Sequence, residues 1–173
     1  MEVERSIQNI HLTHEQLLKL IQKSFPNCYK LDDWKLLSGG ALNTTYKFQV
    51  GHNEFVLRIY LRDRAHCKTE KAIHQLIDQS VSTPKLIYAN EFHEPWAYSI
   101  FELIQGSHIS EISKHDKNSL SYKLGHLLAS IHTFTFSQAG LFGDGISIGV
   151  PFEKKAQALT MKKHFQFYLK VCM

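Results

Sequence analysis

Two adjacent glycines, Gly39 and Gly40, precede a polar run that contains Asn43 and Thr44. Glycine has no Cβ, so backbone amides in such a turn can approach an anion such as a phosphate closely. A plain β-turn is the more common use of such glycines, and the run does not match the G-x-G-x-x-G pattern. The glycines by themselves therefore leave both interpretations open.

Arg58 is the second residue that could do chemistry, because it lies in the apolar run Phe55 to Tyr60. A long cation in an apolar strand loses hydration unless an anion or a carboxylate meets it. Strand alternation puts Val56 and Tyr60 on the same face as Arg58. A cation on a strand beneath a glycine turn indicates a site for a nucleotide triphosphate.

A predicted β-hairpin positions these residues. Apolar and polar residues alternate from Tyr46 to Val50, and Gly51-His52-Asn53 supplies the reversal into a partner strand that runs from Glu54 to Tyr60. This hairpin would lay the glycine turn over the face of the sheet that carries Arg58.

A carboxylate partner for Arg58 is predicted on the next helix. Ile73, Leu76 and Ile77 form an apolar stripe, and Glu70 lies one turn before Ile73. If the stripe packs on the sheet, Glu70 faces the sheet too and can reach Arg58. A solvated helix carboxylate is the alternative.

The other elements define the fold class. Thr13-His14-Glu15-Gln16 has the form of a capping box, so we expect a helix that begins there and ends by Pro26. Further strands are predicted at 34–37, 85–89 and 96–102. Five short strands with one helix after the third predict an antiparallel sheet in an α+β domain. After the sheet we expect a helix from Ser119 to Phe134 and a glycine-rich loop from Gly140 to Gly149, with Gly143-Asp144-Gly145 as a tight surface turn.

Composition excludes several classes of protein. The 173 residues are 43% hydrophobic and 21% charged, as in ordinary soluble domains. The net charge of +4 comes from scattered basic residues, whereas nucleic-acid binding needs a clustered basic face. Three distant cysteines, Cys28, Cys67 and Cys172, form no disulfide or zinc pattern, which fits a reducing cytoplasm. Since the chain has no apolar leader and no long apolar run, we expect neither secretion nor membrane spanning.

Six motifs follow one another over roughly residues 33–135. They are Leu37-Ser38-Gly39-Gly40 with Asn43 and Tyr46, Phe55-Val56-Leu57-Arg58, Glu70, Thr83-Pro84-Lys85-Leu86, Phe101-Glu102-Leu103-Ile104-Gln105-Gly106, and Leu124-Gly125 with Leu128-Ala129 and His132. None is specific alone. Together they resemble the aminoglycoside phosphotransferase and choline kinase-like family. The resemblance implies a protein-kinase-like fold with ATP between two lobes: an N-terminal lobe over 1–102, a hinge over 103–107 and an incomplete helical C-terminal lobe over 108–173.

The resemblance also implies roles for single residues. The phosphate-covering loop would contain Gly39, Gly40, Asn43 and Thr44. Arg58 would replace the strand lysine that holds the α- and β-phosphates, with Glu70 as its ion-pair partner. Val56 and Phe101 would line the adenine pocket. The adenine edge would bond the carbonyl of Glu102 and the amide of Ile104.

The family's catalytic sequences are missing from this chain. Neither H-G-D-(x4)-N nor I-D-(F/W) occurs, and the similar run His115-Asp116-Lys117-Asn118 precedes the Leu124 to His132 motif instead of following it. We therefore assign no catalytic residue and no metal ligand. The chain is expected to be truncated before the catalytic loop and inactive alone, although magnesium and a small-molecule hydroxyl substrate are expected for the full-length family.

Two other functions stay open at this point. The chain could be a non-catalytic nucleotide-binding or protein-interaction module, or the remnant of a disrupted gene. Its last segment, Phe152 to Met173, mixes lysines with aromatic residues. We expect that segment to begin a C-terminal-lobe helix or to be out-of-frame sequence, and its exposed aromatics would favour self-association. The sequence does not identify the phosphate acceptor.

Overall fold

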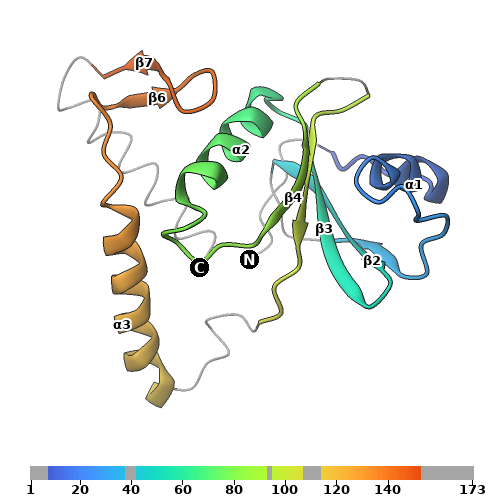
Figure 1. Cartoon of the computed structure of the whole chain (residues 1–173), viewed down its shortest axis with the longest axis horizontal. Coiled ribbons are helices and arrows are strands. Elements are labelled where there is room, and N and C mark those ends of the chain that lie inside the picture. The colour runs from blue at the N-terminus through green and yellow to red at the C-terminus, as the bar shows by residue number, and fades with distance from the viewer. Residues whose placement is uncertain (1–7, 38–41, 93–94, 107–113, 153–173) are drawn as a thin grey trace. The chain divides into compact units, whose positions relative to one another are not determined.

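A computed structural model describes residues 8–37, 42–92, 95–106 and 114–152 (Figure 1). The chain divides into two compact units. The first comprises Met1–Lys71 and Pro84–Ile104, and the second comprises Ala72–Thr83 and Gln105–Met173. Among the described residues, no helix is long and apolar enough to cross a membrane.

The first unit contains the predicted five-stranded antiparallel sheet, with strand order β1-β2-β3-β5-β4. Its strands are β1 (Trp34–Leu36), β2 (Asn43–Val50), β3 (Asn53–Tyr60), β4 (Leu86–Asn90) and β5 (Tyr98–Glu102). The β2–β3 hairpin turns at Gly51, whose φ of 61° favours a residue without a Cβ. The α+β fold expected from the sequence is confirmed.

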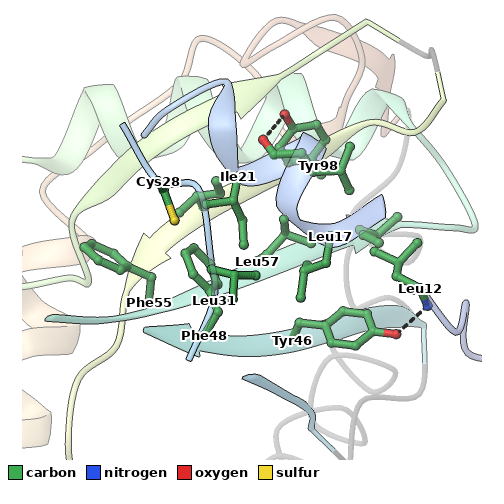
Figure 2. Packing of buried hydrophobic residues seen from close by; sticks show 13 residues of the cluster. Leu12, Leu17, Ile21, Cys28, Leu31, Tyr46, Phe48, Phe55, Leu57 and Tyr98 are labelled. Carbon is green, nitrogen blue, oxygen red and sulfur yellow. Dashed lines mark hydrogen bonds between the residues drawn. The ribbon is translucent and has the colours of Figure 1, made fainter. Parts of the chain in front are cut away.

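One face of the sheet carries the main hydrophobic core, which packs against α1 (His14–Gln22). Phe55, Leu57 and Ile59 alternate along β3 onto this face and are buried. Figure 2 shows Leu17 and Ile21 of α1 packed over β2 and β3. The core therefore forms on the face of β3 opposite the one predicted for Arg58.

The capping box of α1 is confirmed. The amide of Gln16 donates to Oγ1 of Thr13 at 3.2 Å, and the amide of Thr13 donates to Oε1 of Gln16 at 2.9 Å. The helix ends at Gln22, with Lys23 as its C-cap, which is before the predicted stop at Pro26.

The opposite face of the sheet receives the N-terminal part of α2 (Ala65–Ile77). Cys67 is fully buried there and packs with Tyr60 and Ala97. The apolar stripe predicted for this helix is not the part that is buried, since Leu76 is 37% exposed and Cys67 is the buried residue of α2. Cys67 lies one turn before Glu70, so the two residues share a helix face.

The second unit contains α3 (Lys114–Ile131) and a hairpin of β6 (Gly140–Phe142) with β7 (Ile148–Pro151). The predicted helix is confirmed but begins and ends a few residues earlier. The expected loop over Gly140 to Gly149 is wrong, because it forms this hairpin. A Cβ added to Gly143 would lie 2.8 Å from the Cα of Gly149, so glycine allows the two strands to approach.

Candidate functional site

Arg58 and Glu70 form the predicted ion pair. Nη1 of Arg58, in the middle of β3, donates to Oε1 of Glu70 on α2. The Arg58 side chain is 37% exposed and the Glu70 side chain is 26% exposed, so the pair lies at the border between protein and solvent. The Arg58 side chain is thus paired with Glu70 and still partly exposed to solvent.

Tyr60 holds the second oxygen of the same carboxylate. Its hydroxyl donates to Oε2 of Glu70, and the residue is only 3% exposed. Burial, reinforced by the negative charge of Glu70, raises the pKa of the Tyr60 phenol, so the hydroxyl keeps its proton. Sequence reasoning missed this role, although the position of Tyr60, two residues after Arg58 on the same strand face, was a usable signal.

Ser99 and Cys67 extend the polar cluster inward. Ser99 on β5 is the direct cross-strand partner of Arg58 and is fully buried. Its Oγ hydrogen-bonds the Tyr60 hydroxyl at 3.1 Å and lies 3.5 Å from Sγ of Cys67. Burial raises the pKa of the Cys67 thiol, so this thiol stays neutral beneath the ion pair.

Phe101 provides an apolar surface beside the cation. The Cζ of Arg58 lies 5.3 Å from the centre of the Phe101 ring, within cation–π range. Phe101 is buried and pairs across the strands with Val56, which is partly buried. Val56 and Phe101 therefore lie together on the face that carries Arg58, as the sequence implied.

Asn43 and Thr44, the two described residues of the predicted phosphate loop, lie on opposite faces of β2. Thr44 is fully buried, accepts from the amide of Ile10 at 2.9 Å and donates to Oδ1 of Asn9 at 3.3 Å. Thr44 was predicted to form part of the phosphate-covering loop, and this is wrong for its side chain, because β2 turns that side chain to the core face. The next residue, Thr45, is the cross-strand partner of Arg58.

The rest of the predicted loop is only partly described. Asn43 begins β2 opposite Tyr60, on the Arg58 face. Gly39 and Gly40 lie outside the described residues.

The predicted hinge follows β5. The amide of Glu102 donates to the carbonyl of Lys85 at 2.9 Å, and the amide of Leu103 donates to the carbonyl of Glu54 at 3.0 Å. These two bonds fix the chain as it leaves the sheet. Ile104, the next residue, is 59% exposed.

The described residues contain no group of three His, Cys, Asp or Glu that could hold a metal ion. Asp144 lies in the β6–β7 turn, where its carbonyl accepts from Oγ of Ser147 at 2.7 Å, which confirms the predicted surface turn. The run His115 to Asn118 is helical and lies within α3.

A five-stranded antiparallel sheet with a strand cation paired to a helix carboxylate has the architecture of the N-terminal lobe of a protein-kinase-like fold. The model of the phosphotransferase enzyme family (APH) matches residues 33–164. Because this match covers most of the chain, the chain belongs to the phosphotransferase enzyme family. The family resemblance found in the sequence is thus confirmed. No curated protein matches the chain.

Solved structures share the fold. Aminoglycoside phosphotransferase APH(4)-Ia matches with a TM-score of 0.63 and 18% identity, over 88% of this chain and 51% of that chain. A thermostable mutant of that enzyme, in ternary complex with ADP and hygromycin B, matches with a TM-score of 0.60 and 18% identity over 89% and 52%. The streptomycin-ATP complex of APH(2")-IIa matches with a TM-score of 0.52 and 19% identity over 74% and 42%. The chain thus spans about half the length of these structures or less.

Proposed function

We propose that this chain is the ATP-binding part of a small-molecule kinase, which transfers a phosphoryl group from ATP to a substrate hydroxyl. Membership of the phosphotransferase enzyme family supports the class of reaction. Solved structures with the same fold hold ADP with hygromycin B, or ATP with streptomycin.

The observation that carries the proposal is that the Arg58 side chain is paired with Glu70 and still partly exposed. A guanidinium has five N–H donors, and in Arg58 one on Nη1 donates to the Glu70 carboxylate. The side chain is 37% exposed, so other N–H groups of the guanidinium can donate to oxygens of the α- and β-phosphates. A structural ion pair alone does not require the cation to face solvent from the middle of a sheet.

The neighbouring apolar residues suit the base of the nucleotide. Val56 and Phe101 would line the adenine, and the carbonyl of Glu102 with the amide of Ile104 would bond its edge. Gly39, Gly40 and the following Asn43 would cover the phosphates. We keep the lobe boundaries proposed from the sequence, with 103–107 as the hinge between a lobe over 1–102 and a partial helical lobe over 108–173.

We also propose that the protein is cytoplasmic. A separate proposal is that the isolated chain transfers no phosphate. The two catalytic sequences of the family do not occur in its 173 residues. Without the carboxylates that orient the hydroxyl and hold magnesium, positioning and charge stabilisation are lost. Incubation with labelled ATP, magnesium and a panel of aminoglycosides or amino-alcohols should yield no phosphorylated product, and turnover would contradict this part.

The decisive experiment compares ATP with adenosine by calorimetric titration. Arg58→Met removes the charge, and Arg62→Met makes the same change at an exposed position of the same unit. We expect Arg58→Met to weaken ATP binding about 10- to 100-fold, from the strength of hydrogen bonds to charged groups. Adenosine binding should be unchanged, and Arg62→Met should behave like the wild type.

Equal ATP affinity in the Arg58→Met variant and the wild type would overturn the site. A loss of ATP and adenosine binding together would assign Arg58 to the stability of the sheet and would also overturn it.

A further inference from the structure

The carboxylate of Glu70 is fixed at both of its oxygens. Arg58 donates to Oε1 and the Tyr60 hydroxyl donates to Oε2. A carboxylate held at one oxygen can still rotate about its terminal torsion, which is broad. The second contact removes that freedom, so the direction from which Glu70 meets the guanidinium is set.

Tyr60 is itself held rigidly. Its ring is buried against Cys67 and Ala97, and its oxygen lies 3.1 Å from Oγ of Ser99. A phenol has one proton, and Tyr60 uses it for the carboxylate, so its oxygen accepts from Ser99. Ser99 is in turn the cross-strand partner of Arg58. Glu70, Tyr60 and Ser99 are therefore linked by hydrogen bonds from the guanidinium of Arg58 to the residue paired with Arg58 on β5.

We propose that Tyr60 is a positioning residue for nucleotide binding, acting through Glu70 to orient the Arg58 guanidinium toward the phosphates. This inference rests on the proposed function. The Phe101 ring, whose centre lies 5.3 Å from Cζ of Arg58, restricts the orientation of the guanidinium from one side. The Glu70 carboxylate restricts it from another. Binding to a group that is already oriented avoids the entropy cost of ordering it.

A purely structural role for Tyr60 predicts a different result. Loss of a buried phenol hydroxyl lowers the stability of the whole unit, and this affects every ligand alike. Loss of positioning affects only ligands that carry phosphates. The ratio of ATP affinity to adenosine affinity therefore separates the two roles.

Tyr60→Phe removes the hydroxyl and keeps the ring. Its matched control is Tyr98→Phe, because Tyr98 is also a buried β-strand tyrosine, but its hydroxyl donates to the carbonyl of Leu20 at 2.9 Å on the core face. By calorimetry with ATP and with adenosine, we expect Tyr60→Phe to weaken ATP binding roughly three- to tenfold, as a fraction of a charged hydrogen bond. Adenosine affinity should be unchanged, and Tyr98→Phe should leave the ratio of the two affinities at the wild-type value.

An unchanged ratio in Tyr60→Phe, alongside a lowered ratio in Arg58→Met, would overturn this inference and leave the proposed function standing. An unchanged ratio in Arg58→Met would overturn the proposed function and the inference with it. If Tyr60→Phe fails to bind adenosine, Ser99→Ala is measured in the same way. Ser99→Ala keeps the Tyr60 phenol but removes its hydrogen bond to Ser99, so the ratio of ATP affinity to adenosine affinity should fall about two- to threefold. An unchanged ratio would overturn the inference.

Discussion

The ion pair between Arg58 and Glu70 should stabilise the first unit as well as serve the site. Arg58→Met and Glu70→Gln each neutralise one partner, and the double variant removes both charges. Each single substitution leaves the remaining charge partly desolvated without its partner. The double variant should therefore lose less stability than the two single variants together.

The exposure of the two side chains sets the magnitude. Fully exposed pairs contribute about 0–1 kcal/mol, whereas breaking a buried pair costs about 3–5 kcal/mol. At 37% and 26% exposure, this pair lies between those limits. We expect each single variant to cost roughly 1–2 kcal/mol and the coupling energy to be about 1 kcal/mol.

Urea unfolding followed by tryptophan fluorescence measures this coupling. The two tryptophans of the chain, Trp34 and Trp96, both belong to the first unit and so report on the unit that holds the pair. The coupling should shrink at high salt, because the exposed side of the pair is screened. If the two substitutions add to within about 0.3–0.5 kcal/mol, the residues act independently and the ion pair is not formed in solution.

Two further predictions concern the same unit. Thr13→Ala should lower the free energy of unfolding by about 1 kcal/mol, because it removes the capping box of α1, and an unchanged urea midpoint would contradict the observed cap. Burial raises the pKa of Tyr60 and of Tyr98 in the folded state, so the fold retains protons that the unfolded chain releases above about pH 10. Stability should therefore be fully present below that pH and fall as the pH rises above it. A spectrophotometric titration should show Tyr60 and Tyr98 ionising only on unfolding, and ionisation of both tyrosines in the folded protein would refute this.

The order of the motifs along the sequence was enough to predict the family. Alternation along β3 gave the face of Arg58, but the pairing with Glu70 was predicted from an apolar stripe that is not the buried part of α2. Cys67, the buried residue one turn before Glu70, is the local signal that places Glu70 on the sheet-facing side of the helix. Both signals are local, because side-chain direction repeats every two residues in a strand and about every 3.6 in a helix. The same reasoning applied to β2 would have corrected Thr44, which shares its parity with Tyr46 and Phe48 of the core.

The glycine-rich stretch from Gly140 to Gly149 was misjudged for a different reason. Glycines are typical of loops, but here Gly143 and Gly149 allow two short strands to approach closely. That use depends on what lies opposite each glycine, and the local sequence does not contain this information.

By itself, the sequence determined which residues share a face of a strand or a helix, and so which residues can lie beside the strand cation Arg58. Only the tertiary structure decided what surrounds them. Because β5 pairs with β3, Ser99 and Phe101 lie beside Arg58 although they are distant in sequence. The hydroxyl of Tyr60 likewise meets Glu70 only because α2 packs on that face, and Ser99 only because β5 pairs with β3. Strand order is set by hydrogen bonding between distant segments, and a local pattern of side chains does not encode which distant strand will be the neighbour.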